Sequence, residues 1–219
     1  MVSQVIRLVL ADSCELIRDA IAARLQTNPR FEVVGTTTSS DDLVQICRRE
    51  RPDVLLMDVD LPGRGTFDAA DAVLHERPQT KVVLLTEHLA DIFVGQALRI
   101  GAAGYLLKSE TYDCLCEAIE KAVSGQTYLS PPVKDRVYFD KTESRLVPRI
   151  ESDLTLLTNR QLEVLRHLAR GDSVKEIAKQ MHLSQKSVDS HKYRIMNKLG
   201  IHDRVELARF AIREGLMLP

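Results

Sequence analysis

Four polar residues, each directly after a short apolar run, could form one phosphate-binding site: Asp12, Asp58, Thr86 and Lys108. Two carboxylates can hold Mg²⁺, which favours oxygen ligands and keeps several waters. A hydroxyl and an ammonium can bind the oxygens of a phosphoryl group. A carboxylate such as Asp58 can also act as the nucleophile that accepts the phosphoryl group.

These side chains can meet only if the apolar runs before them lie side by side. The runs are short, mostly aliphatic and nearly unbroken, which is typical of strands buried on both faces. Segments with helical spacing alternate with them, so the sequence predicts an α/β, flavodoxin-like, doubly wound domain with a five-stranded parallel sheet over residues 1–125. In such a sheet, chemistry gathers beyond the carboxyl ends of the strands. The five expected strands are Ile6–Ala11, Phe31–Gly35, Val54–Met57, Val82–Leu85 and Tyr105–Leu107.

A less regular stretch, residues 126–153, follows this domain. It contains Ser130-Pro131-Pro132 and many charges, and its hydrophobic periodicity is weak. We expect a linker with a helix around Val133–Phe139.

Residues 154–219 carry the start and stop signals of four short helices, so the sequence predicts a small all-α domain. Polar residues that cap helices precede the apolar periodic segments, and glycines stand where helices should end. The signals are capping boxes at Thr158/Gln161, Ser173/Glu176 and Asp203/Glu206, a Leu157/Leu162 hydrophobic staple, a cap at Ser184, and stops at Gly171 and Gly200.

The net charge of −1 hides an asymmetry between the two parts of the chain. Residues 1–154 hold 18 Lys and Arg against 24 Asp and Glu, a net charge of −6, whereas residues 155–219 hold 12 against 7, a net charge of +5. A basic helical domain indicates a polyanionic partner.

Composition argues against several other classes of protein. Aromatic residues make up 5% of the chain and Trp is absent, which disfavours an aromatic-rich binding surface. The longest apolar runs have about five residues, far below the roughly 20 that a membrane span needs, and no secretory signal follows Met1. We therefore expect a cytoplasmic protein with reduced thiols and no membrane partner. Its cysteines, none in a CxxC pair, are Cys14, Cys47, Cys114 and Cys116.

One expected helix, Gln185–Lys198, has one apolar and one polar, partly basic face. Val188, Ile195 and Leu199 share a face with Met196 beside them and can bury against neighbouring helices. The opposite face suits the major groove of DNA, where polar side chains meet base edges. That face holds Lys186, Asp189, Ser190, Tyr193, Arg194 and Asn197, and Lys179, Lys192 and Lys198 could add phosphate contacts.

The first part of the chain resembles a bacterial response-regulator receiver domain from about Val5 to Gly125. The resemblance rests on Leu10-Ala-Asp-Ser, Pro52-Asp-Val-Leu-Leu-Met-Asp58-Val-Asp-Leu-Pro-Gly63, Val82-Val-Leu-Leu-Thr86 and Gly101-Ala-Ala-Gly-Tyr-Leu-Leu-Lys108. It implies several roles, which follow from the family and not from spacing. Asp58 would be the phosphoacceptor, Thr86 and Lys108 would bind the phosphoryl group, and Tyr105 would be the aromatic switch residue. Mg²⁺ would be held by Asp12, Asp58 and the backbone carbonyl of Asp60. Asp60 and His88 would tune how fast the phosphoryl group is lost.

Two positions depart from the receiver pattern. Ser13 stands where the family usually has a second acid that ligates Mg²⁺, so we expect metal affinity to be weakened. Gly65-Thr66 stands where an acidic residue and Gly are common, which alters the loop near the site. Ser13 leaves an alternative open: a DNA-binding transcription regulator with an atypical receiver that is controlled without phosphorylation.

The last part resembles the LuxR-type helix-turn-helix domain from Leu157 to about Leu216. The matching segments are Leu157-Thr-x-Arg-Gln-x-Glu-Val-Leu165, Lys175-Glu-Ile-Ala178, Leu183-Ser184, Ser187-Val188-x-x-His191 and Ile195-x-x-Lys198-Leu199. In that family, the last helix, here Arg204–Glu214, mediates dimerisation. Asp189 is acidic where a basic residue is often found, and an acid can accept a hydrogen bond from cytosine N4. The expected DNA-binding residues are Lys186, Asp189, Ser190, His191, Lys192, Tyr193, Arg194 and Lys198.

Together the two resemblances imply a two-component response regulator of the NarL/FixJ type, a DNA-binding transcription regulator and not an enzyme. A histidine kinase would phosphorylate Asp58, and the further partners would be double-stranded DNA, RNA polymerase and a second copy of the chain. An enzyme or nucleotide binder on the same sheet would need a phosphate-cradling Gly-rich loop, which Gly63 and Gly65 do not form. A sigma-factor-like subunit would leave the acidic cluster unexplained.

Overall fold

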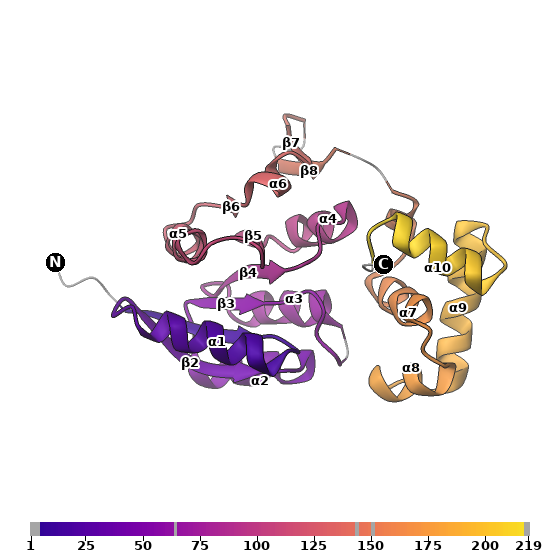
Figure 1. Cartoon of the computed structure of the whole chain (residues 1–219), viewed down its shortest axis with the longest axis horizontal. Helices are drawn as coiled ribbons and strands as arrows, with labels where there is room; N and C mark the ends of the chain where they lie inside the picture. The colour runs from indigo at the N-terminus through magenta and orange to yellow at the C-terminus, as the bar shows by residue number, and fades with distance from the viewer. Residues whose placement is uncertain (1–4, 64, 143–144, 150–151, 217–219) are drawn as a thin grey trace.

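The computed structural model describes residues 5–63, 65–142, 145–149 and 152–216. It contains an α/β domain, a linker arm and a helical domain (Figure 1). The predicted outer limits of the two domains, Met1 and Pro219, lie outside the described residues. Among the described residues, every helix is too short or too polar to cross a membrane.

The α/β domain is built on a parallel sheet with the strand order β2-β1-β3-β4-β5-β6. The prediction of five strands was short by one, because the chain after α5 returns to pair with the edge of β5, at Gly104↔Tyr128 and Tyr105↔Leu129. A strand of two residues is too short to show a periodicity in the sequence. The strands are β1 (Ile6–Ala11), β2 (Phe31–Thr37), β3 (Val54–Met57), β4 (Lys81–Thr86), β5 (Gly104–Leu107) and β6 (Tyr128–Leu129).

Helices cover both faces of this sheet, which explains why its central strands are apolar at successive positions. On β3, Leu55 packs into one core cluster and Leu56 into the other. The first cluster holds residues of α2, α3 and α4, and the second holds residues of α1 and α5. The helices are α1 (Glu15–Gln26), α2 (Leu43–Glu50), preceded by the 3₁₀ turn η1 (Ser40–Asp42), α3 (Thr66–Glu76), α4 (Asp91–Arg99) and α5 (Tyr112–Val123).

The linker forms a short helix and a hairpin: α6 (Pro131–Lys134), β7 (Val137–Asp140) and β8 (Arg145–Pro148). The helix expected over Val133–Phe139 was therefore wrong beyond Lys134. Proline at the first helical position starts α6 after Ser130. The β-branched and aromatic residues of 137–139 then favour a strand, which pairs antiparallel with β8. Pro148 lies against α4, where a Cβ on Gly95 would be 3.2 Å from Pro148 Cγ.

The helical domain contains η2 (Asp153–Leu156), α7 (Asn159–Arg170), α8 (Val174–Gln180), α9 (Gln185–Leu199) and α10 (Arg204–Arg213). The capping boxes expected at Thr158 and Ser173 are confirmed, as is the Ser184 cap. Gly171 and Gly200 end their helices in the left-handed conformation, with φ of 97° and 65°. Asp203 caps α10 by accepting from Val205 N at 2.7 Å, which differs from the expected box with Glu206.

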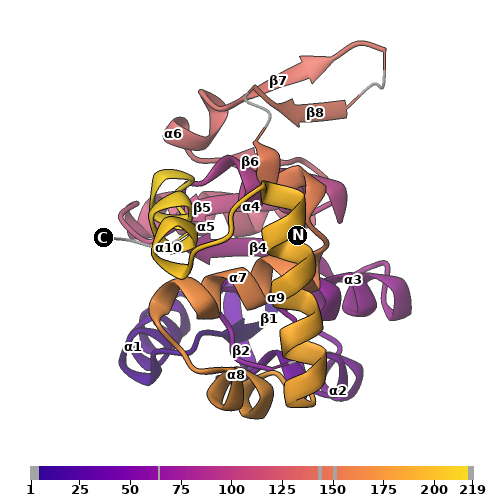
Figure 2. The same ribbon diagram turned by 90° about the vertical axis from the view of Figure 1, so that its right-hand side faces the viewer.

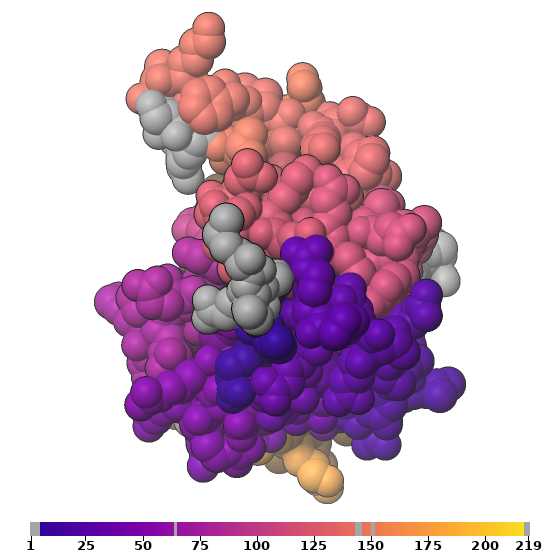
Figure 3. All heavy atoms as spheres, turned by 90° about the vertical axis from the view of Figure 1, so that its left-hand side faces the viewer, coloured from indigo at the N-terminus to yellow at the C-terminus, as the bar shows by residue number. Residues whose placement is uncertain are grey.

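The helical domain lies beyond the carboxyl ends of the strands, with α7 nearest the sheet (Figure 1). Figure 2 views the molecule from the side of the helical domain and places α9 and α10 in front of α7, on the side turned away from the α/β domain. From the opposite side, the α/β domain and linker fill most of the view, and only a small part of the helical domain is visible at the lower edge (Figure 3). The carboxyl edge of the sheet thus faces the second domain.

Candidate functional site

Asp12, Asp58 and Lys108 converge at the carboxyl ends of β1, β3 and β5. The Lys108 ammonium nitrogen is 2.6 Å from Asp12 Oδ2 and 2.5 Å from Asp58 Oδ2. Both carboxylates are buried, at 4% and 6% exposure. Burial lowers the pKa of Lys108, but its hydrogen bonds to the two carboxylates outweigh burial and leave the pKa above its ordinary value. The site is therefore a compact group of two anions and one cation.

Thr86 and Tyr105 lie on the neighbouring strands β4 and β5 and are connected through His88. Thr86 is fully buried and its hydroxyl oxygen accepts a hydrogen bond from His88 N at 3.3 Å. The Tyr105 hydroxyl donates to the His88 carbonyl at 2.7 Å. Burial, helped by the negative charge of Asp58, raises the pKa of Tyr105, so its hydroxyl stays protonated as a donor. The loop after β4 is thus hydrogen-bonded both to Thr86, which the resemblance assigns to phosphoryl binding, and to Tyr105, which it assigns to the switch.

The two buried carboxylates are suitable donors for Mg²⁺, because this ion takes oxygen ligands and retains several waters. Asp12 Oδ1 accepts from Cys14 N at 2.8 Å and Asp58 Oδ1 from Asp60 N at 3.2 Å, so both carboxylates are held in place. Among the described residues, no group of three or more His, Cys, Asp or Glu side chains is arranged to hold a metal ion. Ser13 is exposed at the rim of the site and adds no carboxylate.

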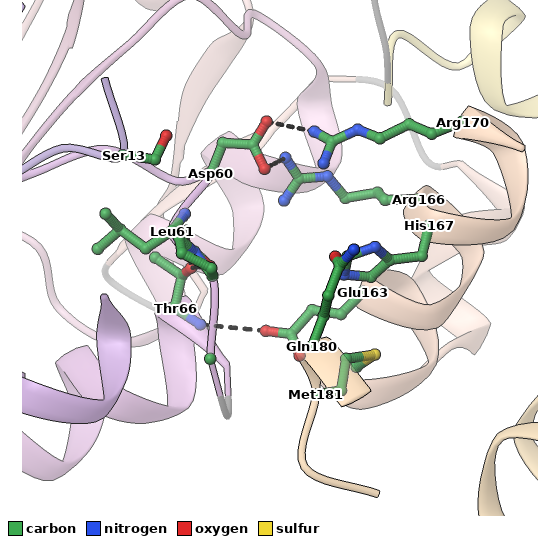
Figure 4. A pocket seen from close by; sticks show the side chains of 12 residues that line it. Ser13, Asp60, Leu61, Thr66, Glu163, Arg166, His167, Arg170, Gln180 and Met181 are labelled. Atoms are coloured by element: carbon green, nitrogen blue, oxygen red, sulfur yellow. Dashed lines mark hydrogen bonds and ion pairs between the residues drawn. The ribbon is translucent and has the colours of Figure 1, made fainter. Parts of the chain in front are cut away.

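The Asp60 side chain points toward α7 of the helical domain and contacts two of its arginines (Figure 4). Arg166 Nη2 is 2.6 Å from Asp60 Oδ1, Arg170 Nη2 binds Asp60 Oδ2, and His88 Nε2 lies 3.6 Å from Oδ2. Burial raises the pKa of Asp60, but the His88 hydrogen bond and the two guanidinium charges outweigh it and hold the pKa well below its usual range. The carboxylate is thus an ionised link between the domains.

Arg166 is itself buried between the two domains. Its Nη1 donates to the Val59 carbonyl at 3.3 Å, and its guanidinium carbon lies 5.0 Å from the centre of the Phe93 ring. Burial lowers the pKa of Arg166, while the charges of Asp60 and Asp58 act in the opposite direction. The expectations from sequence missed Arg166 and Arg170. Their only signal was two arginines one helical turn apart on a helix that also carries a set of apolar residues with helical spacing.

A second set of contacts surrounds this ion pair and includes the loop in which the sequence departs from the receiver pattern. Thr66 N donates to Glu163 Oε1 at 3.0 Å. A Cβ on the buried Gly65 would be 2.9 Å from the same oxygen, so only glycine fits there without a shift. Asn159 Oδ1 accepts from Gln96 Nε2, and Asn159 Nδ2 donates to Asp68 Oδ1, both at 2.8 Å. The two domains are therefore docked through polar contacts on α7.

The expected nucleic-acid face lies on α9, away from these contacts. Val188 and Ile195 are fully buried in the helical core, as the periodicity predicts, while Tyr193 is 68% exposed. Desolvation, aided by two nearby arginines, lowers the pKa of His191 and favours its neutral form at neutral pH. The exposed members of the expected set are Lys186, Asp189, Ser190, Tyr193, Arg194 and Lys198, and His191 and Lys192 are half-buried.

Lys198 differs from the other basic residues of this face because its ammonium is engaged within the domain. It donates to the Leu156 carbonyl at 2.7 Å and to Gln161 Oε1 at 2.9 Å. Gln161 is also the reciprocal partner in the Thr158 capping box. Lys198 therefore joins the end of α9 to the start of α7.

Comparisons with known proteins agree with this two-domain reading. The family model described as "Response regulator receiver domain" matches residues 8–120, and the model described as "Bacterial regulatory proteins, luxR family" matches residues 155–211. Response regulator UvrY of Escherichia coli is 34% identical over 211 residues, 96% of this chain and 95% of UvrY. Response regulator GacA of Pseudomonas aeruginosa is 31% identical over 212 residues, 97% of this chain and 98% of GacA.

Solved structures show the same fold. The RcsB response regulator of Salmonella typhimurium superimposes with a TM-score of 0.73 at 22% identity, over 97% of this chain and 99% of that one. RcsB from Salmonella enterica serovar Typhimurium, bound to a promoter in the presence of a phosphomimetic, gives a TM-score of 0.67 at 24% identity, over 94% and 97% of the two chains. The comparisons lend no support to a receiver controlled without phosphorylation.

Proposed function

Because this chain belongs to the family of bacterial response regulators that join a receiver domain to a LuxR-type DNA-binding domain, we propose that Asp58 is its phosphoacceptor. The protein is a phosphorylation-controlled, DNA-binding transcription regulator. The observation that carries the proposal is the convergence of the Asp12 and Asp58 carboxylates on one ammonium, Lys108 Nζ, at the edge of the sheet.

In the proposed reaction, an Asp58 carboxylate oxygen attacks the phosphorus of a phosphohistidine on the kinase. The new O–P bond forms as the P–N bond breaks, and the imidazole leaves with the electron pair and takes a proton from solvent. The Lys108 ammonium already contacts Asp58 and can bind a phosphoryl oxygen as the charge arrives. The Thr86 hydroxyl, at the carboxyl end of the neighbouring strand β4, would bind another phosphoryl oxygen by turning from its contact with His88 N.

Receiver domains generally bind Mg²⁺ at the phosphorylation site. We assign the ion to Asp12, Asp58 and the backbone carbonyl of Asp60, where it would neutralise charge on the phosphoryl oxygens. Ser13 offers a neutral hydroxyl in place of a second charged ligand, so we expect weaker Mg²⁺ binding than a second carboxylate would give.

In the proposed output, α9 enters the DNA major groove. Base contacts would come from Asp189, Ser190 and Tyr193. Phosphate contacts would come from His191 and Lys192, with Lys186 and Arg194 of the same polar face beside them. The docked receiver contacts α7 and leaves the polar face of α9 exposed. Phosphorylation would therefore not act by uncovering α9. It would act on how the DNA-binding domains of two copies of the chain are held together. The proposal also includes a homodimer on DNA, recruitment of RNA polymerase and a cytoplasmic location. It includes no enzymatic reaction.

The test is the intact mass of the protein after incubation with a small phosphodonor and Mg²⁺, for wild type, Asp58→Ala and Ser13→Asp. We expect one phosphoryl adduct on wild type, none on Asp58→Ala, and the same adduct on Ser13→Asp at a lower Mg²⁺ concentration. No adduct on wild type at any Mg²⁺ concentration, or an adduct that survives Asp58→Ala, would reject Asp58 as the phosphoacceptor.

A further inference from the structure

The hairpin β7–β8 projects from the body of the molecule, with β7 on its outer side (Figure 1 and Figure 2). Its base is held on α4, where Arg136 Nη1 lies 2.8 Å from Asp91 Oδ1 and Pro148 of β8 packs against the helix. β7 nevertheless exposes two aromatic side chains, Tyr138 at 46% and Phe139 at 58%. Neither the packing of the core nor the proposed DNA contacts account for them.

The outer edge of β7 carries backbone groups that can pair with another strand. Arg149 N donates to the Arg136 carbonyl at 2.8 Å, which makes these two residues a hydrogen-bonded pair of the hairpin. Hydrogen-bonded and non-hydrogen-bonded pairs alternate along an antiparallel ladder, so Val137 and Phe139 direct their N–H and C=O groups away from β8. Pro148, opposite Val137, fits this alternation because it has no N–H to donate. These outward groups accept or donate no hydrogen bond within the part of the chain that the structure describes.

We propose that the outer edge of β7 binds the same edge of a second copy of the chain, so that the two hairpins form one four-stranded antiparallel sheet. A two-fold axis passes between the two Tyr138 residues, and Val137 of each copy pairs with Phe139 of the other. This is the antiparallel register in which both outward-facing residues of each copy exchange backbone hydrogen bonds. The inference specifies a contact within the homodimer that the proposed function includes, and it does not depend on phosphorylation of Asp58.

The order of charges around Tyr138 is complementary to itself when it is read in the opposite direction. In the proposed register, Arg136 stands opposite Asp140 of the second copy. Beyond the ends of the strand, the same register places Asp135 opposite Lys141. Unlike charges therefore face each other, whereas two parallel strands in register would place like charges opposite each other. This self-complementarity favours a second copy over an unrelated protein as the occupant of the edge.

The exposed aromatic side chains are covered in the same arrangement. Tyr138 lies against its counterpart in a non-hydrogen-bonded pair, where the side chains of opposite residues approach most closely. On the other face of the strand, Phe139 packs beside Val137 of the second copy, which is 5% exposed in the single chain. The edge is short, so the contact is weak between free chains and adds to the affinity of two copies already held together on DNA.

The first experiment traps the contact with a disulfide under mild oxidation by oxidised glutathione, measured on non-reducing gels. In all variants the accessible cysteines are replaced and only the buried Cys47 is kept; the replacements are Cys14→Ser, Cys114→Ser and Cys116→Ser. In the proposed register, the Cα atoms of the two residues 138 are about 4.5 Å apart, within the range that a disulfide spans. Tyr138→Cys should therefore form a covalent dimer at least about tenfold faster than Thr142→Cys, an exposed control on the same hairpin. Equal rates would overturn the inference.

The second experiment asks whether the backbone edge of β7 is responsible for the cross-link. Phe139→Pro, added to the Tyr138→Cys protein, removes an outward N–H from each copy but no hydrogen bond of the hairpin itself. Leu146→Pro makes the same change opposite Phe139 on β8 and is the control. We expect the cross-linking rate to fall about tenfold with Phe139→Pro and to stay unchanged with Leu146→Pro. A rate that Phe139→Pro leaves unchanged, or that both prolines lower equally, would count against pairing through β7.

The hairpin contact and the proposed phosphoacceptor fail in different ways. A phosphoryl adduct on Asp58 without faster cross-linking of Tyr138→Cys rejects the hairpin contact alone. Faster cross-linking of Tyr138→Cys without an adduct on Asp58 rejects the phosphoacceptor alone and leaves the hairpin contact supported.

Discussion

The Asp58 carboxylate accepts a hydrogen bond from the Lys108 ammonium at 2.5 Å, across 50 residues of sequence. The same ammonium is paired with Asp12, so one cation directly after β5 compensates two buried anions that follow the neighbouring strands β1 and β3. Removing one partner of a buried ion pair leaves a charge that neither water nor protein compensates. The stability of the receiver is therefore expected to depend on this one side chain.

Lys108→Gln should lower the free energy of unfolding by about 3 kcal/mol, because it leaves two carboxylates buried without a counter-ion. Urea unfolding measures the loss, and MgCl₂ should restore part of it by supplying positive charge at the same place. Lys121→Gln, which removes a half-buried surface lysine paired with Glu117, is the control and should change stability by less than about 1 kcal/mol. A loss equal to that of the control would mean that Lys108 does not compensate the buried charges.

Gly65→Ala should separate the two domains. The glycine has a φ of +136°, and its new Cβ would lie 2.9 Å from Glu163 Oε1 and 3.3 Å from Oε2. Gly125→Ala is the matched control, since Gly125 also has a positive φ, of +80°, but has nothing within 4 Å of its Cβ position. Both variants carry backbone strain, of roughly 1–2 kcal/mol at Gly125 and up to about 3 kcal/mol at Gly65, and only the first should increase the radius of gyration. A larger radius in both variants would show that strain, and not the contact with Glu163, is responsible.

The convergence of Asp12, Asp58 and Lys108 could be predicted from the sequence because it follows from topology. Each residue follows an apolar run, and the carboxyl ends of parallel strands meet at one edge of the sheet. The starts of α7, α8 and α9 and the carboxyl ends of α7 and α9 could be predicted for a different reason, since capping is local chemistry within a few residues. Both kinds of information are present in short stretches of chain.

The docking of the domains could not be predicted, because the periodicity of α7 reports burial and does not say against which element. Arg166 is an arginine at a buried position, and its partner Asp60 lies in a loop of the other domain. The resemblance assigned the Asp60 side chain only a role in tuning phosphoryl loss, and assigned its backbone carbonyl to Mg²⁺ binding. The hairpin β7–β8 was missed because the aromatic residues of 137–139 also fit a helical face over so short a span.

Cys47 should make the receiver lose stability at alkaline pH. Burial raises the pKa of its thiol from 9.0 to about 12. A group whose folded-state pKa is raised contributes stability that is fully present below pH 9.0 and is lost as pH rises towards 12, at up to about 1.4 kcal/mol per pH unit. Urea unfolding between pH 8 and pH 10.5 should show a steeper loss for wild type than for Cys47→Ala. Cys14→Ala, at an exposed position, should keep the wild-type slope, and identical slopes in all three proteins would contradict the prediction.

Asp189 should shift the base preference of α9, because an acid accepts a hydrogen bond from cytosine N4 whereas a lysine donates to guanine. Selection of binding sites from a randomised duplex should therefore give different preferred sequences for wild type and Asp189→Lys. The difference should be confined to one or two base pairs in each half-site, where Asp189 faces the groove. Identical preferences would mean that Asp189 is not in contact with bases.

Lys186 and Lys198 are both lysines of α9, but the structure gives them different roles. Lys186 is exposed on the polar face, so Lys186→Gln should weaken binding to all DNA sequences alike and reduce the slope of log affinity against log salt by about 1. Lys198 donates to Leu156 O and Gln161 Oε1, so Lys198→Gln should leave that slope nearly unchanged and instead lower the unfolding free energy by about 1–2 kcal/mol. Fluorescence anisotropy at several salt concentrations measures the slopes, and urea unfolding measures the stabilities. A reduced salt slope in Lys198→Gln with full stability would reverse the assignment and place this ammonium on a DNA phosphate.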